Sequence, residues 1–238
     1  SSLMKTITLL ILFLLSIGKA MANEWKIYAS YHNISKAIKT DARIFALANG
    51  GLFSYDTEDS RVMGYDKTNA LSDFGVYDIA YSATEKKLVV LYENGNVDLL
   101  GMDGTRWNLP DIKSKTLGDK TLNELKVVNG EAFISLNAGL AHINLKGGYF
   151  VNLYTFDSKV TNATLQNGKI YAKTATGVME GDLAKNLLDK GNWTAVAANK
   201  VTFGPTAAEK AEAEAAMGQV KGIVIDSPAS FVSANTSV

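Results

Sequence analysis

A glycine that follows an apolar strand recurs along this chain and constrains its fold more than any other feature. Four segments place that glycine between two apolar or alternating runs, namely 43–56, 87–100, 131–144 and 169–182. Their glycines are Gly51, Gly95, Gly139 and Gly177, which lie 44, 44 and 38 residues apart. A spacing held this closely indicates one supersecondary unit that is repeated along the chain.

Each unit carries two further strand-like segments, one on each side of the glycine-linked pair. The preceding segments are 34–40, 76–82, 122–128 and 160–166, and the following ones are 60–66, 105–111, 148–156 and 191–197. Four antiparallel strands in roughly forty residues are typical of a β-propeller blade. We therefore predict an all-β fold in which residues 23–200 form four recognisable four-stranded blades of an incomplete propeller.

The strand pattern agrees with blades that stack face to face. The run "LVVLY" at 88–92 is apolar on both faces, as a strand covered on both sides requires. The four recurring glycines are predicted to supply the positive φ that a short link between antiparallel strands needs. Residues 25–30, headed by Trp25, are expected to form an outer strand ahead of the first blade. Trp107 and Trp193 fall at fourth-strand positions.

The two ends of the chain do not follow the repeat. Lys5, an apolar run at 7–18 and Ala20-Met21-Ala22 are typical of a secretory signal peptide over residues 1–22. An N-terminal membrane anchor is the alternative, although the run is shorter than the roughly 20 residues of a membrane span. We expect an exported protein without a membrane span once the signal is removed.

The alanine- and glutamate-rich segment 201–222 predicts a helical or flexible insertion that stays solvated, with Pro205 in its first turn. Residues 223–238 are interpreted as the start of a further blade or a truncated tail, and the chain as a fragment of a longer protein.

Composition and motifs argue against several functional classes. The 24 basic and 24 acidic side chains give no basic excess for nucleic acid, and the chain contains no cysteine. No catalytic, metal-binding or phosphate-binding motif is present, so we predict no enzyme activity, cofactor or metal. His142, in an apolar strand, is interpreted as structural. The acidic loop of Asp56, Glu58 and Asp59 lacks the D-x-D-x-D-G spacing of a calcium site.

Propellers often bind partners where connecting loops converge at one end of the central channel. Two loops that bear aromatic, polar and glycine residues are therefore candidates for a binding surface. Their candidate residues are Tyr31, His32, Asn33, Leu71, Ser72, Asp73 and Phe74.

The segment "YDKTNALSDFGVYDIAYSATEKKLVVLYENGNVDLL" at 65–100 resembles the N-terminal propeller of the PorZ family. The resemblance includes a Gly-Leu-Phe hairpin at 51–53, an "LSD" connector at 71–73 and a "Y-x-N-G-N-V-D-L" strand pair at 92–99. It covers residues 25–198. The same blade style is similar to the propeller repeats of two-component regulator sensors.

The resemblance implies a surface protein of Gram-negative Bacteroidetes that belongs to the type IX secretion system. Its implied role is a non-enzymatic scaffold at the outer membrane, with the sortase PorU, the barrel PorV, PorQ and anionic lipopolysaccharide as partners. The alternative is a periplasmic, ligand-sensing propeller of a hybrid two-component regulator that binds an oligosaccharide. A propeller lyase or glycosidase is disfavoured because the spacing offers no paired carboxylates.

Overall fold

The computed structural model describes residues 33–221 and residue 223. The predicted signal peptide, the strand expected at 25–30, and Tyr31 and His32 therefore lie outside the described residues, as does nearly all of the segment 223–238. Within the described residues, no helix is long and apolar enough to cross a membrane.

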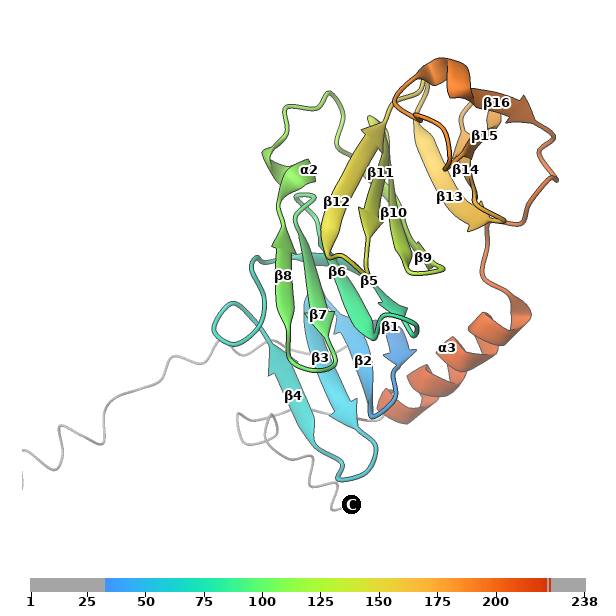
Figure 1. The fold of residues 1–238 in the computed structure, drawn as a ribbon. Coiled ribbons are helices and arrows are strands. Elements are labelled where there is room, and N and C mark those ends of the chain that lie inside the picture. Colours follow the sequence, from blue (N-terminus) through green and yellow to red (C-terminus); the bar gives the residue numbers. More distant parts are fainter. Residues whose placement is uncertain (1–32, 222, 224–238) are drawn as a thin grey trace, which may run out of the picture.

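In the part of the chain that the structure describes, sixteen strands form four antiparallel sheets of four strands, each in sequence order (Figure 1). The first blade contains β1 (Ile34–Lys39), β2 (Arg43–Ala48), β3 (Gly51–Asp56) and β4 (Val62–Tyr65). The second contains β5 (Val76–Ser82), β6 (Lys87–Tyr92), β7 (Val97–Gly101) and β8 (Arg106–Leu109). The third contains β9 (Leu122–Val128), β10 (Glu131–Leu136), β11 (Gly139–Asn144) and β12 (Tyr149–Tyr154). The fourth contains β13 (Val160–Gln166), β14 (Lys169–Thr174), β15 (Gly177–Asp182) and β16 (Trp193–Val196). The prediction of four four-stranded blades is confirmed.

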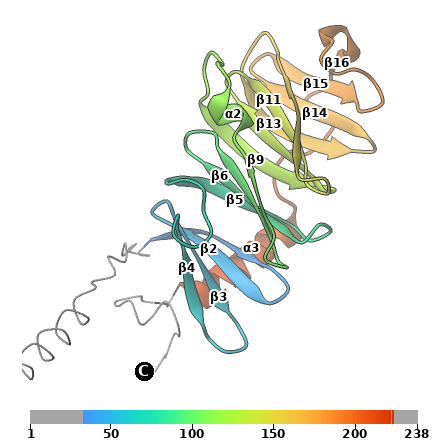
Figure 2. The same ribbon diagram turned by 60° about the vertical axis from the view of Figure 1, so that its left-hand side comes forward.

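The blades follow one another around an arc that does not close (Figure 2). Their first strands β1, β5, β9 and β13 are neighbours from blade to blade, so they form the inner side of the arc. The fourth strands lie on its outer side, as in a propeller.

Three apolar layers hold adjacent blades together. Alternate residues of β6 face opposite neighbours: Leu88 and Val90 pack with the first blade, whereas Val89 and Leu91 pack with the third. All four side chains are fully buried. Burying a side chain of this size contributes about 1.5–3 kcal/mol, so each blade is stabilised mainly by its neighbours. The predicted double-sided burial is confirmed.

The recurring glycines lie at the same corner of each blade but do not all act alike. Gly51 and its counterparts in the third and fourth blades begin the third strand, whereas Gly95 lies inside its turn with φ of 84°. The expectation of positive φ is wrong for Gly51, because Asn49 and Gly50 supply it with φ of 50° and 73°. In a two-residue Asn-Gly turn both turn residues adopt positive φ, so the strand can begin at Gly51 without a positive φ there.

The alanine-rich segment forms α3 (Ala207–Val220), which begins with a capping box between Thr206 and Glu209. Most of the helix is exposed, but Ala216 and Val220 are buried against the face of the first blade that is turned away from the second blade. The expectation of a wholly solvated segment is therefore wrong. Alanine buries little area, yet it lets a helix approach a sheet closely. Pro205 precedes the N-cap instead of lying in the first turn.

Candidate functional site

The four sheets present two different ends. One end, which we call the connector end, carries the links between blades at 66–75, 110–121 and 155–159, together with the hairpins between second and third strands. Backbone hydrogen bonds join each hairpin to the connector that enters its blade. The N–H groups of Glu93, Asn137 and Ala175 donate to the carbonyls of Gly75, Thr121 and Lys159 at 2.9, 3.0 and 3.1 Å. The connectors are thus fixed to the blades.

The first connector contains four of the candidate residues and is anchored at both ends. At its start, the Asp66 carbonyl accepts the N–H groups of Ala70 and Leu71. Leu71 is buried in the apolar layer between the first and second blades. The Val76 N–H at its end donates to the Gly50 carbonyl at 3.0 Å.

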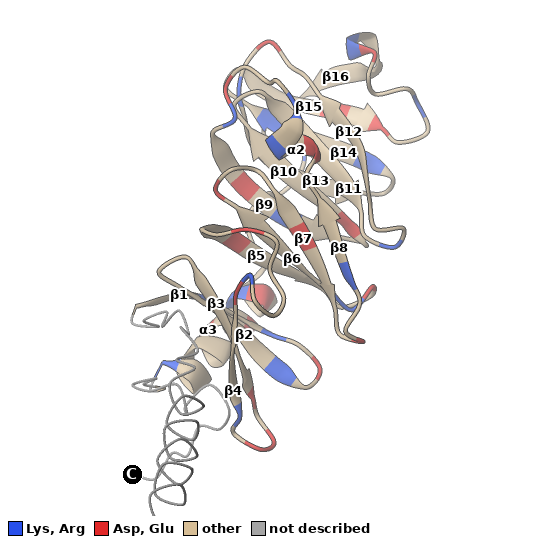
Figure 3. Ribbon diagram, turned by 90° about the vertical axis from the view of Figure 1, so that its left-hand side faces the viewer, with Lys and Arg blue, Asp and Glu red and all other residues tan. Residues whose placement is uncertain are grey.

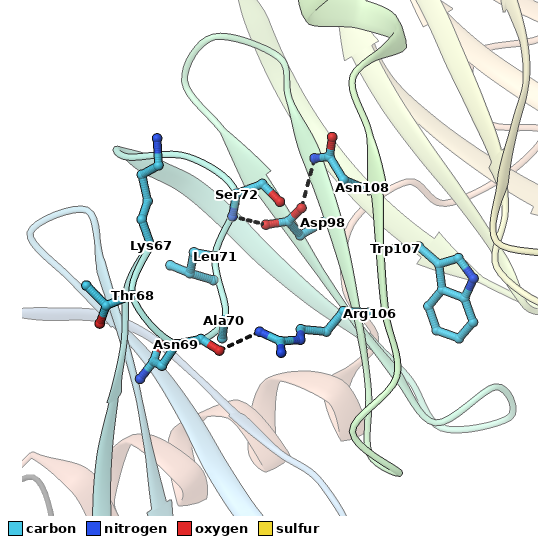
Figure 4. A pocket seen from close by; sticks show the side chains of 10 residues that line it. All are labelled: Lys67, Thr68, Asn69, Ala70, Leu71, Ser72, Asp98, Arg106, Trp107 and Asn108. Atoms are coloured by element: carbon cyan, nitrogen blue, oxygen red, sulfur yellow. Dashed lines mark hydrogen bonds between the residues drawn. The ribbon is translucent and has the colours of Figure 1, made fainter.

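A buried polar network holds the middle of this connector. The Ser72 N–H donates to Asp98 Oδ2 at 2.7 Å, and the hydroxyl of Tyr92 donates to the same oxygen. Asn108 Nδ2 donates to Asp98 Oδ1 at 2.9 Å (Figure 4). Burial, and then the bond to Asp98, raise the pKa of Tyr92 far above its usual value, so its hydroxyl keeps its proton and remains a donor. Asp98 is not among the site residues predicted from the sequence, although an aspartate within the apolar run "NVDLL" indicates a buried polar group.

Asp73 joins the first connector to the second. Its Oδ2 accepts from Lys113 Nζ at 2.7 Å, Asn94 Nδ2 at 2.8 Å and Asn96 Nδ2 at 3.2 Å. The hydrogen bond from Lys113, and then that from Asn94, hold the pKa of Asp73 well below its usual range. Asp73 is therefore a carboxylate that fixes two connectors to one hairpin.

This arrangement predicts an acid-sensitive contribution to stability. A carboxyl group whose pKa is lower in the folded state stabilises that state above its ordinary pKa and loses this effect as the pH falls. We expect Asp73→Asn to lower the free energy of unfolding by about 1 kcal/mol at pH 7, with the difference shrinking as the pH falls below 4. Urea unfolding at several pH values measures it. Asp157→Asn, in an exposed pair with Lys190, is the control and should change the free energy of unfolding by well under about 1 kcal/mol at pH 7.

Two aromatic side chains remain exposed beside this network. Phe74 is 62% exposed, with Lys67 Nζ 4.8 Å from the centre of its ring. Tyr77 is 39% exposed and donates from its hydroxyl to the Leu122 carbonyl at 3.1 Å. Asn33, also exposed, precedes β1 next to the hairpin that contacts this connector. The structure thus brings Asn33 and 71–74 to one end of the sheets.

A cavity of about 390 Å³ lies between the first connector and the outer strands of the second blade (Figure 4). We call it the connector cavity. Lys67, Ser72, Asp98, Arg106 and Asn108 line it, and Arg106 donates from its guanidinium to the Asn69 carbonyl. These groups offer hydrogen bonds and positive charge. Among the residues that the structure describes, no group of three histidine or carboxylate side chains is placed to hold a metal.

His142 is satisfied within the third blade. Its Nε2 lies 2.7 Å from Glu131 Oε2 and its Nδ1 lies 2.9 Å from the Tyr154 hydroxyl, and the residue is 4% exposed. Burial, and then the charge of Glu131, raise the pKa of Tyr154 to about 12. The structural interpretation of His142 is confirmed.

An open arc of four-stranded blades with an anchored, polar connector end defines this chain as a β-propeller domain. Comparison with known families is more specific. Residues 44–194 match the family described as the type IX secretion system PorZ N-terminal β-propeller domain. The chain belongs to that family, which confirms the resemblance seen in the sequence.

A solved structure agrees with this assignment. PorZ from Porphyromonas gingivalis, an essential bacterial surface component of the type IX secretion system, is 32% identical with a TM-score of 0.65. The match covers 72% of this chain and 24% of PorZ, so the chain spans about a quarter of that protein. The extracellular domain of BT4673 from B. thetaiotaomicron, described as a hybrid two-component system, is 18% identical with a TM-score of 0.51, covering 68% and 23%. That likeness concerns the fold alone. No curated protein matches.

Proposed function

We propose that this domain is a non-enzymatic scaffold at the cell surface of a Gram-negative bacterium. Its connector end docks other components of the type IX secretion system, namely the sortase or the outer-membrane barrel, and anionic lipopolysaccharide is a further candidate partner. The observation that carries the proposal is family membership over residues 44–194. Docking of partners is the proposed step beyond that membership.

The geometry of the connector end supports a docking role. Phe74 and Tyr77 expose apolar area, and exposed aromatic residues are frequent anchors of protein interfaces. The backbone beneath them is held by Asp73 and Asp98, so little conformational freedom is lost on binding. Basic and acidic residues are interspersed along the blades in the view of Figure 3, which points to a local contact instead of broad electrostatic attraction.

A pull-down from solubilised outer membranes tests the proposal. We expect Phe74→Ser to reduce the captured sortase or barrel at least about tenfold, because the substitution removes an aromatic anchor without touching the core. Tyr149→Ser is the matched control: Tyr149 is 53% exposed but begins β12, at the opposite end of the sheets. Recovery of neither component by the unaltered chain, or equal losses in both variants, would overturn the proposal.

A periplasmic sensor propeller that binds an oligosaccharide is the second candidate. The shared fold with the extracellular domain of BT4673 favours it. The gene sequence downstream of the codon for residue 238 distinguishes the two candidates. A membrane span and a kinase would support the sensor, whereas a second propeller and a β-sandwich, which the resemblance to the PorZ family implies, would support the scaffold.

A further inference from the structure

In each of the four described blades, the second strand begins with a charged residue. These residues are Arg43, Lys87, Glu131 and Lys169, and they begin β2, β6, β10 and β14. We call the interface between two consecutive blades a joint. Because this position recurs in each blade, it can be compared from one joint to the next. The joints between blades one and two and between blades two and three differ in how this position is used.

The joint between the second and third blades is filled. Lys87 is only 8% exposed, and its Nζ donates to the carbonyls of Leu145 and Lys146 at 2.5 and 3.2 Å. The same Nζ lies 4.3 Å from the centre of the Trp107 ring. The ammonium group is therefore capped by two carbonyls and an indole, which occupy the space beside it at this joint.

The corresponding joint between the first and second blades is open. Strand register makes Met63 the counterpart of Trp107, because Met63 pairs with Ser54 as Trp107 pairs with Leu99. The register likewise makes Met102 the counterpart of Leu145. Here Arg43, Met63 and Met102 line a cavity of about 400 Å³, which we call the joint cavity. The smaller thioether of Met63 leaves space that the indole occupies in the next joint.

Two guanidinium groups from consecutive blades line this cavity. Arg43 donates to the Tyr65 hydroxyl at 3.3 Å, and Arg106 donates to the Asn69 carbonyl. Neither forms an ion pair with a carboxylate of residues 33–221. Asp103 is the only acidic residue in the lining, and its Oδ1 accepts from the Thr105 N–H and hydroxyl. The lining thus carries one positive charge in excess.

The remaining walls are largely apolar. Phe45, Met63, Tyr65, Leu100 and Met102 contribute side chains to the same cavity. A strongly hydrated dianion would lose its hydration against these walls, whereas an apolar group would gain from the contact. A guanidinium fork also matches the planar geometry of a carboxylate.

From this lining we propose that the joint cavity binds a monocarboxylate that carries an apolar group, with the carboxylate between Arg43 and Arg106 and the apolar group against Met63 and Phe45. The site lies between two blades and does not depend on docking at the connector end. Its test therefore fails or succeeds separately from that of the proposed function.

Titration calorimetry on the full chain with 3-phenylpropanoate tests the proposal. We expect one site, weakened about tenfold or more by Arg43→Gln and by Arg106→Gln, because each removes a charge-assisted hydrogen bond. We also expect Met63→Trp to abolish binding, since the larger ring reproduces the filled joint. Arg61→Gln is the control, because Arg61 is an exposed arginine of the first blade paired with Asp59.

Two further probes decide the ligand chemistry. The neutral 3-phenylpropanamide and inorganic phosphate should each bind at least about tenfold more weakly than the carboxylate. Thermal melting of every variant confirms that it is folded. The proposal is overturned if 3-phenylpropanoate does not bind, if either probe binds as tightly, or if folded Arg43→Gln and Arg106→Gln variants both retain full affinity.

Discussion

Gly139→Ala is expected to lower the free energy of unfolding by about 3 kcal/mol, through a steric clash added to backbone strain. Gly139 begins β11 with φ of 153°, a region that residues with a Cβ rarely adopt. A Cβ at this position would lie 2.3 Å from the backbone carbonyl oxygen of Tyr154, which the β11–β12 ladder holds in place. Chemical denaturation followed by tryptophan fluorescence measures the loss.

The fourth blade supplies a matched control. Gly177 begins β15 at the corresponding corner with φ of 142°, but a Cβ there would meet no atom within 4 Å. Gly177→Ala should therefore cost only the conformational penalty, about 1 kcal/mol. The difference between the two variants isolates the clash. Equal losses would show that strand β12 moves aside and that the corner is less rigid than its register indicates.

Asp98→Ala is expected to destabilise the chain by about 3 kcal/mol, because it leaves buried donors without an acceptor. Asp98 is 2% exposed and Tyr92 is fully buried, so the Tyr92 hydroxyl lies away from bulk solvent when it loses the carboxylate. The Tyr92 hydroxyl and the Ser72 N–H both lose a partner. Urea unfolding at pH 7 measures the change, and Asp103→Ala, at an exposed aspartate of the same blade, should change stability by less than about 1 kcal/mol.

A double substitution separates the lost acceptor from the lost packing. If the unsatisfied hydroxyl causes most of the damage, Tyr92→Phe added to Asp98→Ala should recover about 1 kcal/mol. In the unaltered chain the same Tyr92→Phe should be destabilising. Additive losses in the double variant would contradict this account of the network.

The blades could be predicted from the sequence because each strand is encoded locally. The run at 88–92 is apolar on both faces, and such a run is stable only between two covering layers. The glycine spacing then indicates how many times the unit recurs. Pattern and structure agree because alternation, turn residues and repeat length all favour one architecture.

Other features depend on contacts that no local pattern encodes. Asp98 accepts a hydrogen bond from the N–H of Ser72, which lies 26 residues away in the sequence. Asp73 accepts one from Lys113, which lies 40 residues away. The packing of Ala216 on the first blade brings together residues from opposite ends of the described chain. The sequence pattern predicts the connector at 71–74 on a converging surface, yet the side chains that anchor it come from other strands. Such partners are found only when the blades are assembled.

The three connectors also differ in length, so they contribute unequally to their end of the molecule. They span residues 66–75, 110–121 and 155–159, the second of which includes the short helix α2 (Asp111–Ser114) that lies beyond the end of β8 in Figure 1. The link into the fourth blade is the shortest of the three. The first two connectors are also joined to each other by the ion pair of Lys113 and Asp73. A protein that binds at this end would therefore find more connector residues on either side of the second blade than beside the fourth.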